Sequence, residues 1–141
     1  SSDLAGLAAV LIPSGDFDMV LYDSAGAVLA STSVDANTVR VSSIGAFQRL
    51  FATPVDVVAG NTYYMTIKPT SATNITLYSF TLNSANDRDA WPMGVEVSSA
   101  TRTDAGAWTT STTTVVSIVP VIDPQPIGLV IHPGMSGGMR G

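Results

Sequence analysis

The chain has 141 residues, a formal net charge of −5 and no cysteine, and only 12% of its residues are charged. This length fits one domain that buries a hydrophobic core without disulfides or a structural metal. Six scattered Lys and Arg residues and a pI near 4.4 argue against binding nucleic acid through its phosphates, which requires a basic patch. The lack of cysteine excludes a disulfide framework, a thiolate zinc site and a thiol nucleophile.

The composition also bears on the surface and on the secondary structure. Soluble domains usually carry about 25% charged residues, so this surface must consist largely of Ser, Thr, Asn, Gly and apolar atoms. Such a surface favours a protein that is packed into an assembly, although it is also common among secreted and viral β proteins. Lys68 is the only lysine and Glu96 the only glutamate, so the best polar helix formers are almost absent. Long helices are therefore not expected.

The first third of the chain alternates between strand-like runs and turns. Leu4 to Ile12 is too short to span a bilayer and has no positive flank, so it predicts a core strand. Asp16 to Tyr22 alternates apolar and polar residues, and the turn sequence D-S-A-G then leads into Val28 to Val34, which predicts a hairpin. The predicted inward face of the first of these hairpin strands carries Phe17, Met19 and Leu21.

The middle of the chain has the strongest strand pattern. Segments 62–68 and 74–82 are rich in Tyr, Ile, Thr and Phe and are separated by P-T-S-A-T, which predicts an antiparallel pair. Two weaker strands are expected before this pair, over 37–42 and over 48–58, and Pro54 should bend the second or place it at an edge. In the first segment, Tyr63, Met65 and Ile67 lie on one face and Tyr64, Thr66 and Lys68 lie on the other, and one of these faces is expected to pack inward.

Loops dominate the next part of the chain. Residues 83–92 and 100–106 are expected to be loops, with a short strand over 94–98 between them. Residues 115–122, V-V-S-I-V-P-V-I, are apolar on both faces, as expected for a strand in the middle of a sandwich or covered by a neighbour. Together these elements predict an all-β fold, an antiparallel, jelly-roll-like β-sandwich over 1–122. Residues 123–141 are rich in Pro and Gly and are expected to form a flexible extension or arm.

One short motif resembles a catalytic one. Residues 134–138 match G-x-S-x-G, the nucleophile elbow of hydrolases, with Ser136 as the serine. That elbow needs a strand before the serine, a helix after it, and an acid and a histidine later in the chain. Three residues follow Gly138, and the only histidine, His132, lies upstream. A glycine-rich tail explains the match, and the chain is not expected to be an enzyme.

Acidic and aromatic loop residues are the candidates for ligand contact. Asp87, Asp89 and Asp104 lie in the predicted loops, and Trp91 lies beside them where no core is expected. Oxygens of these loop residues, or of Asp16, Asp18 and Asp23 around the first hairpin, could hold calcium. Asp16 and Asp18 fit a solvated strand face opposite Phe17 better, and no cofactor or metal is expected. Trp91, Trp108, Tyr64 and Tyr78 could form a platform for a sugar ring, and for Trp108 a structural role in the core or at its end is the preferred interpretation.

Three segments carry a resemblance to known proteins: S-G-D-F-D-M-V-L-Y-D-S-A-G from Ser14, P-V-D-V-V-A-G-N-T-Y-Y from Pro54 and T-R-T-D-A-G-A-W-T-T from Thr101. Together they resemble a β-sandwich repeat of tailed-phage and environmental viral structural proteins. They are also similar in outline to jelly-roll modules of carbohydrate-binding and bacterial surface proteins. The resemblance covers 11–122 and implies a virion component, such as a capsid decoration, head-fibre or tail-associated domain, or an adhesin-like module.

The function predicted from these observations is a non-enzymatic structural or attachment domain of a phage-like virion. Its expected partners are further copies of itself and other virion proteins, with neither nucleic acid nor membrane insertion, and the extension should tie subunits together. The alternative is a carbohydrate-binding module of an extracellular or cell-surface protein that contacts a surface glycan. The residues expected to contact other copies are Ile127, Leu129 and Ile131.

Overall fold

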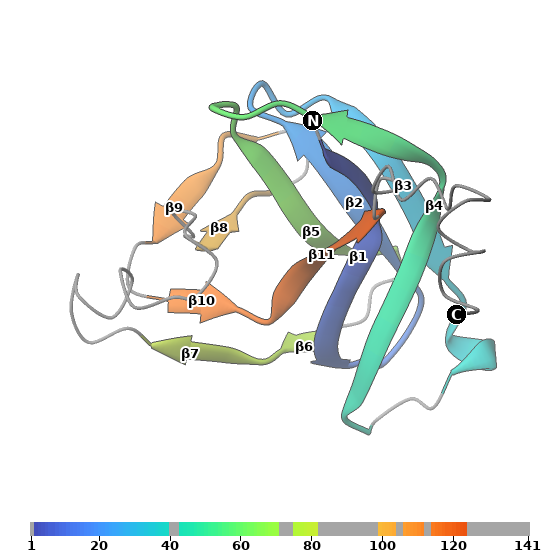
Figure 1. Ribbon diagram of the computed structural model, residues 1–141. Coiled ribbons are helices and arrows are strands. Elements are labelled where there is room, and N and C mark those ends of the chain that lie inside the picture. Colours follow the sequence, from blue (N-terminus) through green and yellow to red (C-terminus); the bar gives the residue numbers. More distant parts are fainter. Residues whose placement is uncertain are drawn as a thin grey trace, which may run out of the picture.

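The computed structural model describes residues 2–39, 43–70, 75–81, 99–103, 106–111 and 114–123. These residues form antiparallel strands and one short 3-10 helix, so the predicted all-β fold is confirmed (Figure 1). The strands are β1 (Ser2–Ile12), β2 (Phe17–Asp23), β3 (Val28–Val34), β4 (Gly45–Val57), β5 (Tyr63–Pro69), β6 (Thr76–Leu77), β7 (Ser79–Thr81), β8 (Ser99–Thr101), β9 (Thr109–Ser111), β10 (Thr114–Val116) and β11 (Ile118–Asp123), and the helix is η1 (Ala36–Thr38).

Two antiparallel sheets make up most of the fold. In the first, here called the β1 sheet, β1 lies between β11 and β4, and β6 continues along the end of β1. In the second, the β2 sheet, β2 lies between β3 and β5. The strands β3 and β4 make contact, as do β5 and β11, so the two sheets face each other as in a sandwich.

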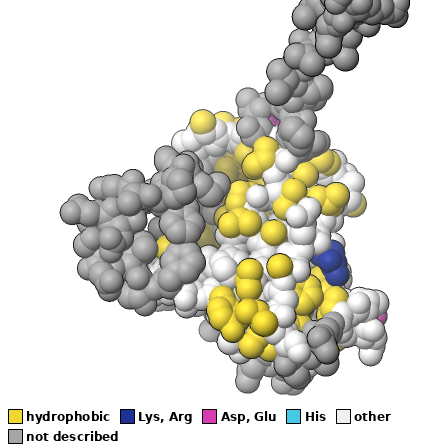
Figure 2. Space-filling view, turned by 60° about the horizontal axis from the view of Figure 1, so that its bottom comes forward, with side chains coloured by type: hydrophobic (Ala, Val, Ile, Leu, Met, Phe, Trp, Pro, Cys, Tyr) yellow, Lys and Arg dark blue, Asp and Glu magenta, His cyan; other side chains and the backbone are white. Residues whose placement is uncertain are grey.

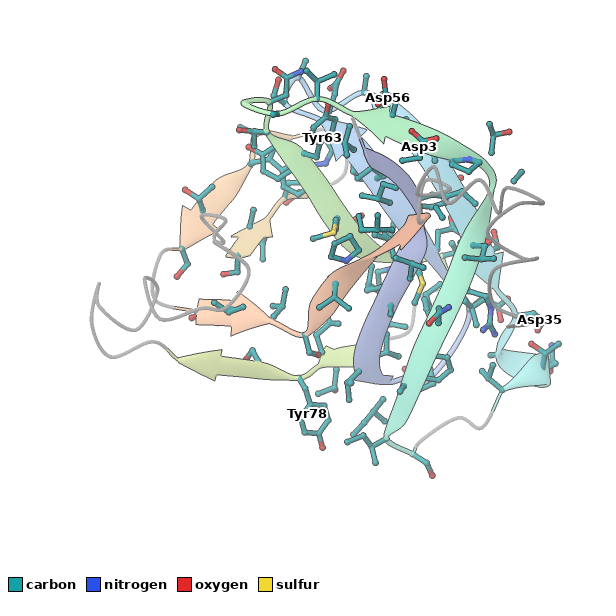
Figure 3. The ribbon with its side chains drawn as sticks, viewed as in Figure 1. Asp3, Asp35, Asp56, Tyr63 and Tyr78 are labelled. Carbon is teal, nitrogen blue, oxygen red and sulfur yellow. The ribbon has the colours of Figure 1, made fainter. Side chains whose placement is uncertain are left out.

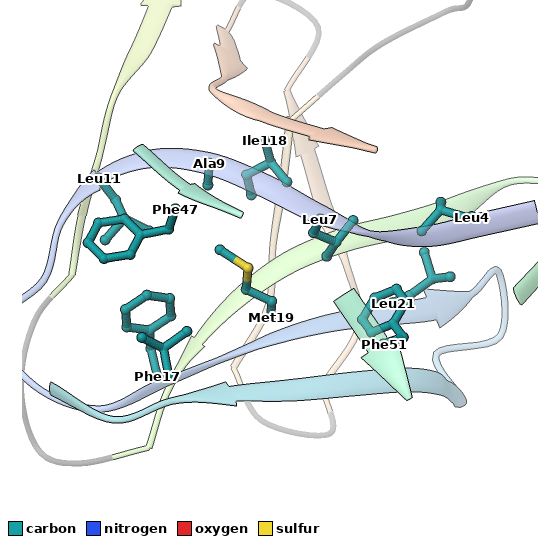
Figure 4. Close-up of a cluster of buried hydrophobic side chains, with 11 residues drawn as sticks. Leu4, Leu7, Ala9, Leu11, Phe17, Met19, Leu21, Phe47, Phe51 and Ile118 are labelled. Atoms are coloured by element: carbon teal, nitrogen blue, oxygen red, sulfur yellow. The ribbon is translucent and has the colours of Figure 1, made fainter. Parts of the chain in front are cut away.

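The hydrophobic core fills the space between these sheets (Figure 4). Phe17, Met19 and Leu21 of β2 are 0% exposed, as the alternating pattern predicts. The ring of Phe17 meets that of Phe47 on β4 edge to face, with 5.7 Å between ring centroids. The other core residues are Leu4, Leu7, Ala9 and Leu11 of β1, Val34 of β3, Phe51 of β4 and Ile118 of β11.

The pairing of β1 with β4 contains one abrupt change of register. Leu4 pairs with Val55 and Gly6 pairs with Leu50, so residues 51–54 of β4 lie opposite Ala5 alone. Pro54 lies in this excursion of β4, which is the outer strand of its sheet, in agreement with the prediction of a bent or edge strand. A Cβ placed on Gly6 would lie 2.1 Å from the Arg49 carbonyl oxygen, so only glycine permits this close approach.

The predicted antiparallel pair of 62–68 with 74–82 is wrong. Tyr63, Met65 and Ile67, which the alternation places on one face of the first segment, pack against the core. However, β5 pairs with β2, β6 pairs with β1, and β7 pairs with β10. The chain crosses from one sheet to the other after β5, because each segment has a longer-range partner that completes a different sheet.

A three-way junction explains how β6 and β11 both lie along the same edge of β1. Tyr78 donates its N–H to the carbonyl of Val10, Val10 donates to the carbonyl of Ser117, and Ser117 donates to the carbonyl of Tyr78. The Ser117 hydroxyl also donates to the Val10 carbonyl, at 2.9 Å. Residues 75–81 and 114–123 therefore pair with each other through β7 and β10. Beyond the junction, β6 pairs with Leu11 and Ile12 at the end of β1, and β11 pairs with the part of β1 from Asp3 to Ala9.

Three further strand predictions need correction. Asn37 and Thr38, expected in a strand over 37–42, lie in η1, because the Asp35 carboxylate accepts the Asn37 N–H and caps that turn. Residues 100 and 101, expected in a loop, lie in β8, which pairs with β9. The run 115–122, expected as one strand, is divided at Ser117 into the end of β10 and β11, and β11 lies at the edge of the β1 sheet and contacts β5.

Candidate functional site

The outer face of the β2 sheet, which points away from the core, is covered. Val20 and Tyr22 alternate along β2 with the core residues, so they lie on this outer face, yet they are only 3% and 5% exposed. The side chains that meet Tyr22 there are Arg102, just after β8, and Trp108, just before β9. The β8–β9 pair therefore brings a second, smaller group of side chains onto the sandwich.

Three aromatic rings and one guanidinium form this group, which we call the Arg102–Trp108 cluster. Tyr22 and Tyr64 are register partners on β2 and β5, so their side chains lie next to each other on the outer face. The indole of Trp108 stacks on the Tyr64 ring at 4.3 Å between centroids and 10° between planes. It meets the Tyr22 ring edge to face, at 5.6 Å. The Arg102 guanidinium carbon lies 4.3 Å from the centre of the Tyr22 ring and 4.5 Å from that of Trp108.

Gly26, in the turn between β2 and β3, completes the cluster. Its φ is +87°, in the left-handed region that glycine enters without strain. A Cβ at this position would lie 2.8 Å from a terminal nitrogen of Arg102 and 3.8 Å from the indole nitrogen of Trp108. The glycine therefore serves both the turn and the close approach of these two nitrogens.

The cluster contains hydrogen-bond donors without acceptors. The Trp108 indole nitrogen is buried and has no hydrogen-bond partner among the described residues. Within the part of the chain that the structure describes, no carboxylate pairs with the Arg102 guanidinium, which makes its contacts with aromatic rings. Buried donors are nearly always paired in folded proteins, so this cluster is the part of the described structure that most needs a chemical explanation.

The cluster does not present a free platform for a sugar ring. Trp108 and Tyr64, two of the residues predicted for such a platform, stack on each other. Tyr78, a third, is 45% exposed and points away from the strands at another part of the molecule (Figure 3). Trp108 therefore packs within the fold, as preferred from the sequence, although it covers the outer face of a sheet rather than filling the sandwich core.

The outer face of the β1 sheet is the second feature of interest. Gly6, Ala8 and Val10 of β1 lie on this face, because they alternate with the core residues Leu7, Ala9 and Leu11. Their register partners on the flanking strands are without exception uncharged. We call this set the apolar face: Gly6, Ala8 and Val10 of β1, Ala46, Gln48 and Leu50 of β4, and Val119 and Val121 of β11.

Part of the apolar face is open to solvent: Gly6 is buried and the β1 residues Ala8 and Val10 are half-buried, whereas its β4 residues and Val119 are exposed. Leu50 is 60% exposed and Val119 is 43% exposed, on strands either side of β1. The space-filling view, in which the bottom of Figure 1 is turned forward, shows hydrophobic side chains gathered over the described part of that side of the molecule (Figure 2).

Acidic residues border the apolar face at one end. Asp3 of β1 is the register partner of Asp56 on β4 and of Asp123 on β11. The side chains of Asp3 and Asp56 lie close together in Figure 3. Among the described residues, no group of three acidic, His or Cys side chains is arranged to hold a metal ion.

The three aspartates of the first hairpin stabilise turns and strand pairs. Asp16 accepts the N–H of Ala36 at 2.7 Å, and Asp18 accepts the hydroxyl of Ser33 at 2.6 Å. Asp23 accepts the N–H of Ala27 at 2.8 Å and so closes the β2–β3 turn. Their oxygens are thus engaged in local hydrogen bonds.

The residues predicted to contact ligands or other copies lie outside the described residues. These are the loop residues Asp87, Asp89, Trp91 and Asp104, and Ile127, Leu129 and Ile131 of the extension. Ser136 and His132 of the G-x-S-x-G match lie outside them too. Sequence analysis missed Arg102, because its role depends on a β8–β9 pair that the loop prediction did not contain.

Comparison with known proteins finds no relative, so this chain is classified by its fold. No protein-family model, curated protein or solved structure matches this chain. Among the described residues, no helix is long and apolar enough to cross a membrane. The fold and the two sites define an all-β, sandwich-like domain with one exposed uncharged sheet face and one aromatic cluster built around an arginine.

Proposed function

We propose that this chain is a non-enzymatic structural or attachment domain that works through contacts between subunits, with the apolar face as its principal contact surface. The observation that carries the proposal is that Leu50 and Val119 are exposed to solvent on the outer face of the β1 sheet, where the paired residues of β1, β4 and β11 are all uncharged. Exposed apolar patches of this kind mark interaction surfaces more often than free surface.

The pleat supplies a physical reason for this proposal. A sheet that faces water on one side usually alternates apolar inward residues with polar or charged outward residues. On β1 the outward positions between the core residues are Gly6, Ala8 and Val10 instead. The small side chains of β1, flanked by the larger Leu50 and Val119, form a shallow surface that a second sheet could cover closely.

The occupant that we propose for this face is a second copy of the same chain. The face carries no charge of either sign at its register positions, whereas the chain as a whole carries a net charge of −5. Contact through the uncharged face lets two acidic molecules approach without placing carboxylates against each other. The extension, with Ile127, Leu129 and Ile131, is proposed to add further contacts by strand addition to a neighbouring copy.

The particle that we propose for this assembly is a phage-like virion. This step rests on the resemblance of the three segments beginning at Ser14, Pro54 and Thr101, together with the low content of charged residues. The roles that this implies are those of a capsid decoration, a head fibre or a tail-associated protein.

The mass of the chain in solution tests the proposal. Light scattering over a range of concentrations should give a mass above that of one chain, and the double variant Leu50→Lys with Val119→Lys should give the mass of a monomer. Lysine at these positions would bury two charges in the contact, which costs several kcal/mol unless each is paired.

The matched control places lysine on an equally exposed apolar residue elsewhere. Val28 is 59% exposed at the start of β3, in the other sheet, so Val28→Lys should leave the mass unchanged. A wild-type chain that stays monomeric at every concentration would refute the proposal, as would an oligomer that survives the double lysine variant. A version ending at Asp123 then measures the contribution of the extension.

A further inference from the structure

We propose that the Arg102–Trp108 cluster is a binding site for a carboxylate-bearing ligand. The proposal concerns a different face of the molecule from the contact between subunits, and it does not depend on that contact. It rests on a partly buried cation without a carboxylate partner among the described residues, and on a buried N–H donor beside it.

The Arg102 guanidinium is a partly buried cation that aromatic contacts alone do not fully stabilise. Contacts with aromatic faces stabilise a cation, but they offset only part of the cost of removing it from water. Proteins usually complete such a site with an anion. In an acidic chain with only six basic residues, a partly buried arginine that rests on two rings is therefore poised to accept an anion.

Two hydrogen-bond donors of the cluster, from Arg102 and Trp108, lie next to the same turn. A terminal nitrogen of Arg102 and the indole nitrogen of Trp108 both lie within 4 Å of the point where a Gly26 Cβ would be. They therefore approach the same side of the β2–β3 turn. Both groups donate hydrogen bonds and neither can accept one, so the complementary ligand offers acceptors only.

The shape of the guanidinium selects among anions. The guanidinium carbon lies over the rings of Tyr22 and Trp108, whose planes are 71° apart, so the group is confined from two sides. A guanidinium is planar, and its N–H bonds lie in that plane as a fork. A carboxylate matches this planar fork with its two oxygens. The exposed residues Thr101 of β8 and Thr109 of β9 are register partners next to the cluster, and their hydroxyls suit a ligand with hydroxyl groups of its own, such as a sugar acid.

The indole N–H resonance of Trp108 reports this binding directly. The chain has two tryptophans, so ¹⁵N-tryptophan labelling gives two indole signals, and the Trp91→Phe variant assigns them. Titration of the full-length chain with sodium glucuronate, at constant ionic strength, should move the Trp108 signal with saturation in the millimolar range, about 1 to 10 mM. Sodium acetate and glucose form two further titrations. A response to acetate equal to that of glucuronate supports a site for the carboxylate alone, and a stronger response to glucuronate supports a sugar acid.

Variants of the arginine separate binding from folding. Arg102→Gln should abolish the saturable shift, and Arg102→Lys, which keeps the charge but loses the planar fork, should weaken it at least about tenfold. Arg49→Gln removes one positive charge from β4 and should leave the titration unchanged. Far-ultraviolet circular dichroism identifies any variant that fails to fold, in which case Arg102→Lys alone decides the outcome.

Several results would overturn the proposal. These are no saturable shift with either carboxylate up to about 100 mM, an equal shift with glucose, or an unchanged titration in Arg102→Lys. Asp104 lies two residues from Arg102 and outside the described residues. The Asp104→Asn variant tests whether Asp104 occupies the site itself. If its Trp108 indole signal is shifted without any ligand, and no ligand shifts that signal in the wild type, the chain fills its own site and the proposal is overturned.

Discussion

Gly6 shows how one residue fixes the geometry of the β1 sheet. A Cβ at this position would lie 2.1 Å from the Arg49 carbonyl oxygen and 2.9 Å from the Leu50 Cα, both of which belong to the backbone. Backbone atoms cannot move aside as the end of a flexible side chain can. Gly6 therefore allows β4 to leave its register with β1 and return four residues later.

Gly6→Ala should destabilise the fold by about 2 kcal/mol or more, because β1 and β4 must separate locally to admit the methyl group. Urea unfolding followed by circular dichroism measures the change. The control is Gly60→Asn, since Gly60 has a φ of +87° with no atoms within 4 Å, and asparagine tolerates that conformation. Equal stability of Gly6→Ala and wild type would show that the close approach is not present in solution.

Phe17 should be the most costly side chain to shorten. It is 0% exposed and packs against Phe47 with the rings nearly perpendicular, at 88°. Phe17→Ala should lower the free energy of unfolding by about 3 to 5 kcal/mol, from lost burial and the cavity left behind. Val28→Ala, at a residue 59% exposed, should cost less than about 0.5 kcal/mol in the same urea titration. Similar losses in the two variants would contradict the assigned core.

At the scale of elements, the sequence predicts individual strands better than their partners. The alternation of Phe17, Met19 and Leu21 correctly predicts β2 and its inward face, and D-S-A-G correctly predicts the turn to β3, with Gly26 at a φ of +87°. By contrast, 62–68 and 74–82 look like a hairpin locally but pair with β2, β1 and β10. A strand pattern states which face is buried, and it does not state which strand lies alongside.

The Arg102–Trp108 cluster was not predicted for a related reason. Its rings come from β2, from β5 and from the start of β9, and its cation follows β8. These residues are far apart in the sequence and form no spaced motif. Only the register of Tyr22 with Tyr64, together with the β8–β9 pair, brings them into contact.

The pairing of β1 with β4 places two like charges side by side. Asp3 and Asp56 are register partners, and like charges directly opposite each other destabilise a sheet. Asp56→Asn should therefore raise the free energy of unfolding by about 0.5 kcal/mol at neutral pH, and less at high salt, because salt screens the repulsion. Asp56→Glu keeps the charge and should change little. A less stable Asp56→Asn protein, measured by urea unfolding, would exclude a net repulsion at this pair.

At the scale of the whole molecule, composition and fold agree on a surface that suits assembly. Charged residues make up 12% of the chain, and the register positions of the apolar face carry none of them. The low charge content was evident from the sequence. Which face would lack charge was not, because it depends on the pairing of β1 with both β4 and β11.

Salt should strengthen the association of subunits. The proposed contact is apolar, whereas each copy carries a net charge of −5, so the charges that oppose assembly are screened at high ionic strength. Light scattering at about 50 mM and about 500 mM NaCl should therefore give the larger mean mass at the higher salt concentration. Dissociation at high salt would point instead to a contact held by ion pairs.

Protection of single cysteines against a thiol reagent tests most directly whether the apolar face is the contact between copies. The chain contains no cysteine, so Gln48→Cys on the apolar face and Ser31→Cys on β3 each introduce one thiol, at exposed positions of opposite sheets. As the protein concentration rises through the association range, labelling of Gln48→Cys should slow while that of Ser31→Cys stays constant. Labelling of Gln48→Cys that is independent of concentration, in a sample that light scattering shows to be oligomeric, would contradict the assignment of this face.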